Sequence, residues 1–284
     1  MVADKELKNF PIIPSDRKDD LHNLEYADSA DLVLFVAGNQ FMVMDELLEA
    51  FQKEAPEIKK IFFETLPPGL ELKQLLAGGA IFRDKIIDAV PDVYASVSER
   101  AMEHLETVGL ITKGDYFLYL HNRIVLMVPD GNPAQIRSVS DLGRNEVRIS
   151  QPNPEYEDIA YYIMDMYRDS GGDELVHRVM EEKRAEGTTI LTVVHHRETP
   201  LRIEKKTVDV GPVWATEIIY AKQRNRAVEM VEPGKELDQR EKINYYICKL
   251  KNAPHPANAE KFLDFIKSPR AQRIYEKYGF VPHC

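Results

Sequence analysis

The chain has 284 residues, of which 44% are hydrophobic and 30% charged, a composition typical of a globular protein with a substantial core. Its 37 lysines and arginines against 47 aspartates and glutamates give a net charge of −10. This charge argues against binding to nucleic acid or to an anionic membrane surface, which both favour a basic face, but it leaves room for a local anion site. No apolar run approaches about 18 residues, so no membrane-spanning helix is predicted.

The first 30 residues are charged, with scattered apolar positions and two prolines. They predict an irregular arm that lies on the body of the protein through Phe10, Ile12 and Ile13.

From residue 31 the sequence alternates apolar strands with amphipathic helices. Strands are predicted over 31–37, 58–63 and 91–95, and the helices that follow them over 42–55, 70–77 and 99–108. The turns in between, 38–40, 64–69 and 96–98, are polar or contain glycine. Strands connected through helices run parallel and end at one edge of a sheet, so we expect the three turns to lie together beside a binding crevice.

A second α/β unit is predicted after a strong turn at 129–133, which follows two strand-like pieces around residues 121–123. Its elements are a strand over 147–150, helices over 156–168 and 173–186, and a strand over 188–194. A polar turn at 195–198, a short helix from Thr199 and a strand over 208–214 complete a βαβ unit. This turn carries two imidazoles and a guanidinium beside a helix start, which suits an anion, although a solvated loop with a helix cap has the same pattern.

The chain ends with predicted strands over 218–222 and 243–250 and helices over 257–266 and 270–278. We therefore expect an α/β protein of two lobes with a ligand cleft. Residues 31–123 and 218–284 would form a discontinuous first lobe, residues 124–217 the second, and residues 1–30 the arm. The two crossings of the chain would act as a hinge.

Motifs for nucleophilic catalysis, zinc proteolysis or nucleotide binding do not occur in the required strand–helix context, and we expect neither an enzyme nor a cofactor. Cys248 and Cys284 lack metal-ligand spacing, so no resident metal is predicted. Ser96 and Ser98 precede a helix, where serines are caps or ligand donors. Trp214, the only tryptophan, is either a core residue or a wall of the cleft.

Five segments, in order, resemble bacterial extracellular solute-binding proteins of the molybdate/tungstate type, the receptor components of ABC importers. They are DLVLFVAGNQFMVMDELLEAFQKEAPEIK, PDVYASVSERAMEHL, NRIVLMVPDGNPAQIRSVSDLGRNEVRISQPNPE, VHHRETPLRIEKKTVDVGPVWATE and ANAEKFLDFIKSPRAQRIYEKYGFVPH. The resemblance covers most of residues 31–284 and leaves residues 1–30 outside. It implies a type II periplasmic-binding-protein fold that closes around a small anion like a Venus flytrap, with two crossing strands as hinge. It also implies a monomer that delivers its ligand to a membrane permease.

The resemblance places the ligand-binding residues in loops at the strand ends. Carried over by position, they are Gly38, Asn39, Gln40, Thr65, Ser96, Asn153, Glu155, Ala215 and Thr216. The turn with His196 and Arg197 would add positive charge, and Trp214 would line the cleft.

The chain departs from the molybdate type after the first two strands, where Asn39-Gln40 and residues 64–68 replace the small hydroxyl residues of that type. Glu64, Glu155 and Glu217 are also expected near the cleft, where carboxylates repel a dianion. One resolution is that Glu64 and Glu155 bond the metal centre of an oxometalate directly. The other is a different ligand, a small organic or phosphorylated acid held by Arg197.

A receptor of this type is secreted, so we expect periplasmic or extracellular localisation, with the signal peptide lying outside the present sequence. A cytosolic ligand-sensing or enzymatic two-lobed protein is the alternative, because the N-terminal residues lack the apolar core of a signal peptide.

Overall fold

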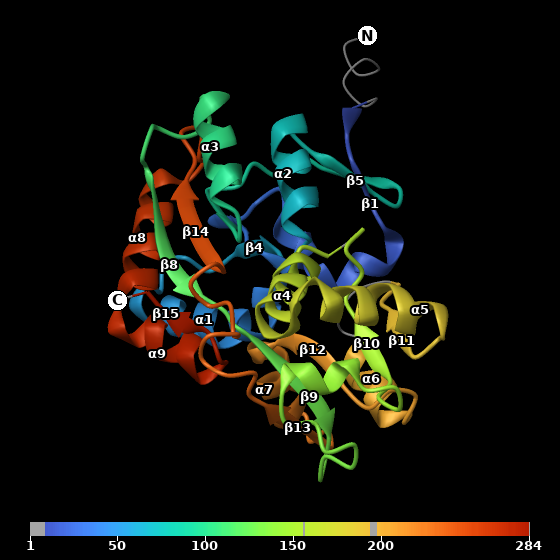
Figure 1. The fold of residues 1–284 in the computed structure, drawn as a ribbon. Coiled ribbons are helices and arrows are strands. Elements are labelled where there is room, and N and C mark those ends of the chain that lie inside the picture. Colours follow the sequence, from blue (N-terminus) through green and yellow to red (C-terminus); the bar gives the residue numbers. More distant parts are fainter. Residues whose placement is uncertain (1–8, 156, 194–197, 284) are drawn as a thin grey trace. The chain divides into compact units, whose positions relative to one another are not determined.

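The computed structural model describes residues 9–155, 157–193 and 198–283 (Figure 1). They group into two compact units. Unit 1 holds the described residues of Met1–Leu120, Asn244–Lys277 and Pro282–Cys284, and unit 2 holds those of His121–Ile243 and Tyr278–Val281. The chain enters unit 2 close to the predicted crossing but returns only at Asn244, so residues 218–243 belong to unit 2 rather than to the first lobe.

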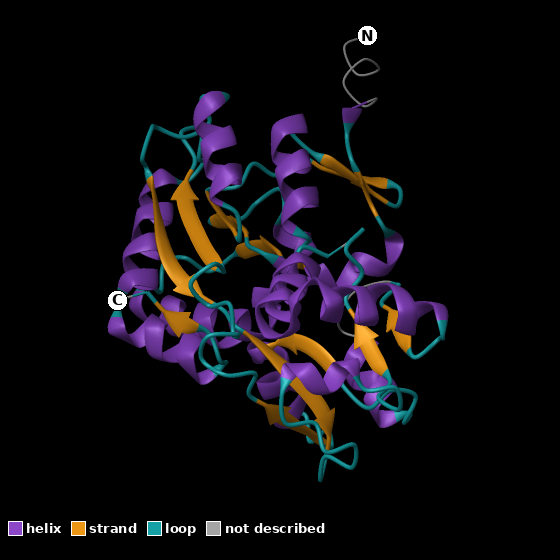
Figure 2. Cartoon of the chain, viewed as in Figure 1, coloured by secondary structure: helices purple, strands orange, loops and turns teal. Residues whose placement is uncertain are grey.

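Unit 1 is built on a seven-stranded sheet with the strand order β15-β8-β14-β7-β3-β4-β2. Figure 2 draws the strands of the chain in orange. The strands are β2 Leu21–His22, β3 Leu32–Phe35, β4 Ile61–Glu64, β7 Val93–Ser96, β8 Tyr116–His121, β14 Asn244–Lys249 and β15 Val281–Pro282. Strand β3 runs parallel to both β4 and β7, which confirms the sequence prediction. The turns after these three strands therefore lie at the same edge of the sheet.

Helices cover the central strands of unit 1. They are α1 Phe41–Glu54, α2 Pro68–Ala77, α3 Glu99–Thr107, α8 Pro256–Lys267 and α9 Pro269–Lys277. Every residue of β3, β4 and β7 is buried, as expected for parallel strands that are covered on both faces. Phe35 and Phe62 share a core with Met102 of α3, and Phe51 of α1 packs edge-on against Phe262 of α8 with ring centroids 5.2 Å apart.

The N-terminal segment is more regular than the predicted arm. Strand β1 Ile12–Ile13 pairs in parallel with β5 Ala80–Phe82, which forms a hairpin with β6 Lys85–Ile87, and β2 pairs antiparallel with β4. Phe10 packs against Gly79 and Ile13 is buried, as expected. The prediction was wrong for Ile12, whose surface is 71% exposed, because residues alternate between the two faces of a strand.

Unit 2 contains β9 Ile124–Pro129 between β12 Gly211–Trp214 and β13 Val228–Val231, both antiparallel to it. Strands β10 Ile149–Gln151 and β11 Thr189–Leu191 form a parallel pair, and Val210 bridges Ile149 in parallel just before β12. The chain thus leaves β11, forms α6 Glu198–Glu204 and returns on the other side of β10. The predicted βαβ unit is confirmed, and β10, β11 and β12 end at a common edge.

Two helical regions of unit 2 test the local predictions. Helix α4 Ile159–His177 is interrupted at Gly171 and Gly172, where a break between two helices was predicted, and continues through a π-helical turn, Arg178–Glu182, into α5 Lys183–Ala185. The predicted strand over 218–222 is wrong, because this segment belongs to helix α7 Ala215–Gln223. Ile218 and Ala221 enter the core of unit 2 at helical spacing, so tertiary packing overrides the β-propensity of the run.

Candidate functional site

The candidate site of unit 1 is the edge where β3, β4 and β7 end. Gly38 begins the turn after β3 and lies directly against the backbone of the turn after β4. A Cβ atom at Gly38 would stand 2.8 Å from the carbonyl oxygen of Thr65 and 3.0 Å from that of Leu66. Only a residue without a side chain permits this approach. The structure therefore brings two of the predicted ligand loops into contact.

The amides after Gly38 tie its turn to neighbouring strands. The Nδ2 of Asn39 donates to the Tyr245 hydroxyl of β14, and the Oε1 of Gln40 accepts from the Tyr119 hydroxyl of β8 at 2.8 Å. Gln40 is fully buried, whereas Asn39 is partly exposed. Among the described residues, Asn39 Oδ1 and Gln40 Nε2 find no hydrogen-bond partner. Gln40 thus supports the turn from within the core, and Asn39 lies at its surface.

Thr65 and Ser96 supply hydroxyl groups at the ends of β4 and β7, and both are buried. The Thr65 Oγ1 lies 3.0 Å from His22 Nε2, and the Ser96 Oγ accepts from the Ser98 N–H at 3.3 Å. Hydroxyl groups both donate and accept, so two of them at the ends of the strands that flank β3 suit a small polar ligand. His22 was missed as a member of this edge because it lies in the segment predicted to be an arm.

Two buried acids lie behind the turn after β4. Gln74 Nε2 donates to Glu64 Oε1 at 2.9 Å, and the Leu66 N–H donates to Glu71 Oε1 at 3.0 Å. The second oxygen of each acid has no hydrogen-bond partner in the described part of the chain. Burial raises the pKa of Glu64 to about 8, and burial together with the nearby Glu64 holds the pKa of Glu71 well above its usual value.

Glu64 is therefore mostly protonated, and so uncharged, at neutral pH. Glu64 does not present a carboxylate to a ligand, contrary to the expectation from the sequence, because its side chain is fully buried against α2 rather than solvated. The turn after β4 consequently carries no negative charge from Glu64 that would repel an anion.

In unit 2, the loop after β10 is organised by Asn153. Its N–H donates to the Thr192 hydroxyl at 3.0 Å, and its Oδ1 accepts from the Glu155 N–H at 3.0 Å. The Thr192 hydroxyl in turn donates to the buried Glu157. Asn153 therefore joins the ends of β10 and β11, while Glu155 is exposed at the tip of the loop.

The remaining predicted residues of unit 2 follow β12. Trp214 is 5% exposed and its ring centroid lies 6.4 Å from that of Tyr162, in keeping with its interpretation as a core residue. Ala215 and Thr216 begin α7 and are fully buried. The Ala215 N–H donates to the carbonyl oxygen of Arg123 at 2.9 Å, and Thr216 Oγ1 accepts from Asn122 Nδ2 at 3.3 Å. These bonds fix the first turn of α7 beside the start of β9.

His196 and Arg197, the predicted source of positive charge, lie outside the described residues. The residues on either side are described. Glu198 accepts from the Val193 N–H at 2.8 Å and from Arg202 Nη2 at 2.6 Å. The acid at the start of α6 therefore bonds both to Val193, which follows β11, and to Arg202 of its own helix.

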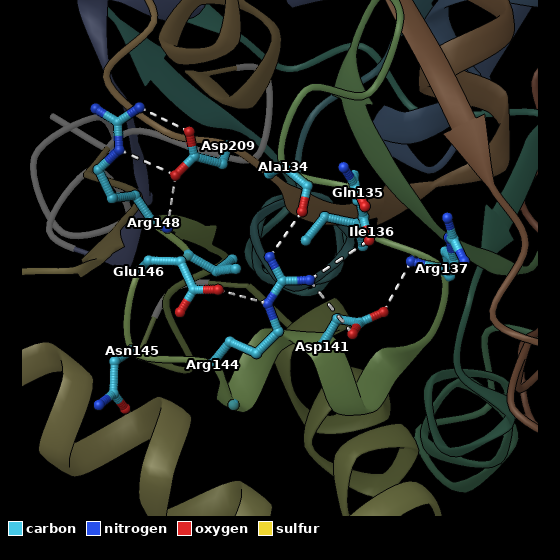
Figure 3. Close-up of polar contacts among 12 residues, drawn as sticks. Ala134, Gln135, Ile136, Arg137, Asp141, Arg144, Asn145, Glu146, Arg148 and Asp209 are labelled. Atoms are coloured by element: carbon cyan, nitrogen blue, oxygen red, sulfur yellow. Dashed lines mark hydrogen bonds and ion pairs between the residues drawn. The ribbon is translucent and has the colours of Figure 1, made fainter.

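A second polar region of unit 2 is a hollow of about 590 Å³ lined by Pro133, Ala134, Gln135, Arg144, Glu146 and Asp209 (Figure 3). Arg144 donates to Glu146 Oε1 at 2.9 Å and to the carbonyl oxygen of Ala134 at 2.7 Å. Arg148 contacts both carboxylate oxygens of Asp209, at 3.0 and 2.7 Å, and these bonds raise its pKa. Both guanidinium groups are thus already paired with acids.

Two absences hold for residues 9–155, 157–193 and 198–283. Within them, no three or more His, Cys, Asp or Glu side chains gather in an arrangement that could hold a metal ion. Their helices are all too short or too polar to cross a membrane. Cys248 is buried in β14 as a free thiol, and Cys284 lies outside the description.

Known proteins resemble this chain over most of its length. It is 26% identical over 210 residues to the putative ABC transporter substrate-binding lipoprotein YvgL of Bacillus subtilis, covering 72% of this chain and 73% of that one. It is 20% identical over 262 residues to the molybdate-binding protein ModA of Escherichia coli, covering 90% of each. The solved substrate-binding domain of a putative molybdenum ABC transporter from Clostridium difficile matches with a TM-score of 0.69 at 17% identity, covering 89% of this chain and 99% of that one.

This structural match confirms the predicted α/β periplasmic-binding-protein fold. The sequence pattern of the family described as "Bacterial extracellular solute-binding protein" matches residues 32–281, which include both sets of strand-end loops and exclude the N-terminal segment. The family is non-catalytic. The chain therefore belongs to the bacterial extracellular solute-binding proteins.

Proposed function

We propose that this protein is the receptor of an ABC importer, which captures a small oxyanion and delivers it to a membrane permease. Molybdate and tungstate are the favoured ligands. Family membership supports the receptor role. The similarity to a putative ABC transporter substrate-binding lipoprotein and to a molybdate-binding protein supports the importer and the oxyanion class.

The observation that carries the oxyanion assignment is the chemistry of the strand ends in unit 1. An oxyanion is held in proteins by neutral hydrogen-bond donors and by positive partial charges, and it is repelled by carboxylates. Asn39, Thr65 and Ser96 are neutral polar residues on three adjacent turns. The acid that ends β4, Glu64, is held in its neutral form. We propose that these groups of unit 1 bind the ligand and that Gly38 and Gln40 shape the turn that carries Asn39.

We also propose four ligand-binding residues of unit 2, namely Asn153, Glu155, Ala215 and Thr216. The buried starts of α7 and of the loop after β10 lie at the ends of neighbouring strands, as in unit 1. His196, Arg197 and Trp214 complete the proposed set. We also propose that the protein acts outside the cytoplasmic membrane, as its family description states for the group.

The test is a ligand panel read by thermal shift and then by calorimetry. The panel contains molybdate, tungstate, sulfate, phosphate, citrate and phosphoglycerate. A ligand at 100 times its dissociation constant stabilises the folded state by ~2.7 kcal/mol, which a melting curve resolves. A matched control is Arg144→Gln, which alters the paired hollow of unit 2 and should bind like the wild type.

Stabilisation by molybdate and tungstate would support the proposal. Stabilisation only by citrate or phosphoglycerate would overturn the oxyanion assignment and leave a receptor for organic or phosphorylated acids. An unchanged melting temperature with every compound would overturn anion capture.

A further inference from the structure

His22 lies against the candidate ligand loop although it precedes the range that matches the family, residues 32–281. Its Nε2 is 3.0 Å from the Thr65 hydroxyl, across 43 positions of sequence. The contact joins the N-terminal segment, which lies outside this matched range, to a residue that the proposed function places beside the ligand.

The imidazole is held in place by two contacts with β4. Strand β2 pairs with β4 so that His22 stands opposite Phe63, and the two rings stack with centroids 4.1 Å apart and planes 3° from parallel. A backbone hydrogen bond joins the same two segments, since the Thr65 N–H donates to the carbonyl oxygen of Asp20 at 2.9 Å. The N-terminal segment therefore fixes both the backbone and the side chain of Thr65.

The turn after β4 has few donors left for a ligand. The Thr65 N–H is bonded to Asp20, and the Leu66 N–H is bonded to the Glu71 carboxyl. Pro67 and Pro68 have no N–H to offer. Among residues 65–68, all of which are described, the Thr65 hydroxyl is thus the one donor that remains for an anion.

Whether the Thr65 hydroxyl can donate to a ligand depends on which group donates in its hydrogen bond with His22. A hydroxyl group has a single hydrogen and two lone pairs. If Thr65 donates to His22, its hydrogen is used and only lone pairs face a ligand, which an anion avoids. If His22 Nε2 carries the hydrogen and donates, the hydroxyl hydrogen is free for the anion.

We propose that His22 is a positioning residue, which donates from Nε2 to the Thr65 hydroxyl and so turns the hydroxyl hydrogen toward the bound anion. The proposal rests on the proposed function, since it requires an anion at Thr65. His22 acts through Thr65 and does not itself touch the ligand.

The experiment is a double-mutant cycle on the affinity for molybdate, measured by calorimetry, or for the panel anion that the wild type binds most tightly. His22→Phe keeps the ring that stacks on Phe63 and removes the nitrogen. Thr65→Val keeps the shape of threonine and removes the hydroxyl. We expect each to weaken binding by about fivefold, the effect of one hydrogen bond, and the double variant to bind no more weakly than Thr65→Val.

Two further variants separate positioning from a purely structural role. His22→Gln retains an N–H donor and should restore most of the affinity lost in His22→Phe. Asn23→Ala removes a different bond from the same segment, from Asn23 Nδ2 to the carbonyl oxygen of Ile61 at 2.9 Å. It should lower the melting temperature and leave affinity unchanged.

The outcomes separate this inference from the function on which it rests. If Thr65→Val weakens binding and His22→Phe does not, or if their effects add, His22 is not acting through Thr65 and the inference is overturned alone. If Thr65→Val has no effect, the ligand does not use this hydroxyl, and both the site assignment at Thr65 and the inference fall. If the wild type binds none of the anions, the proposed function fails first.

Discussion

The strand ends of unit 1 and the hollow of unit 2 differ in whether their polar groups are already paired with opposite charges. Arg144 lines the hollow and Arg148 binds the lining residue Asp209, but hydrogen bonds to Glu146 and Asp209 already occupy these two guanidinium groups. At the strand ends, the turn after β4 has no cation, yet the nearby acid Glu64 is neutral and the Thr65 hydroxyl lies at a junction of loops.

The difference shows that counting arginines is a poor way to find an anion site. An arginine that is paired with a carboxylate attracts a further anion only weakly, because its charge is already neutralised. A neutral hydroxyl donor beside the protonated Glu64 still attracts an anion, because no carboxylate charge opposes it. The same argument explains how a chain with a net charge of −10 is compatible with an anionic ligand.

The largest expected effect is that of Glu64→Gln on the pH dependence of the free energy of unfolding. Burial raises the pKa of Glu64 in the folded state from 4.5 to about 8, so the folded chain keeps a proton that the unfolded chain releases. This contribution to stability is fully present below pH 4.5 and is lost as the pH rises toward about 8, by at most ~1.4 kcal/mol per pH unit. Urea unfolding between pH 5 and 8 should show a smaller slope for Glu64→Gln than for the wild type.

The matched control for this slope is Glu57→Gln. Glu57 is a surface acid whose hydrogen bond to Lys261 lowers its pKa, so its removal should leave the slope above pH 5 unchanged. Equal slopes in the wild type and Glu64→Gln would contradict the neutral state of Glu64.

Gly38→Ala should have the next largest effect, because its Cβ would stand 2.8 Å from the Thr65 carbonyl oxygen and the two turns would have to separate. Overpacking of this kind costs about 1–3 kcal/mol, and we expect at least a ~10-fold loss of molybdate affinity in calorimetry. Gly69→Ala is the control, because nothing lies within 4 Å of a Cβ at that position. Equal affinities for the two variants would exclude the turn of Gly38 from the site.

Tyr245→Phe tests a single support of the same turn. It removes the hydroxyl to which Asn39 donates, and we expect molybdate to bind about fivefold more weakly, the effect of one hydrogen bond. Tyr246→Phe serves as the comparison, since its hydroxyl bonds to Glu99 at 3.2 Å instead. A similar loss in both variants would point to general damage of β14.

The smallest effect is expected for Arg148, which pairs with Asp209 at the hollow of unit 2. Arg148→Ala removes an ion pair to Asp209 whose arginine side chain is 43% exposed, so solvent screens it and stability should fall by at most about 1 kcal/mol. Anion affinity in calorimetry should equal that of the wild type. Weaker binding by this variant would show that a paired arginine does contribute, and it would reverse the comparison.

Local patterns in the sequence were sufficient for the parallel core of unit 1. Strands such as Leu32–Phe35 are continuous apolar runs, and each is followed within a few residues by glycine or polar residues and a helix. These features depend on neighbours along the chain, so they predict β3, β4 and β7 and the edge where their turns meet. The break at Gly171 and Gly172 was predictable for the same reason.

The features that the sequence did not reveal depend on distant partners. Residues 218–222 form a helix because they pack onto the core of unit 2, although their side chains also suit a strand. The neutral state of Glu64 requires its burial against α2 and Gln74. The role of His22 beside Thr65 depends on β2, a strand of two residues that pairing with β4 defines. None of these three features leaves a periodic pattern in the sequence.

Strand β2 also has a consequence for handling the protein, because it occupies the outer edge of the seven-stranded sheet. A version trimmed to residues 32–281, the range that a family comparison suggests, would make β4 the edge and leave its backbone groups on that side without their partner. Exposed edges of apolar strands join other sheets and aggregate. We therefore expect the short segment before residue 32 to protect the protein from aggregation, and preparations should retain it.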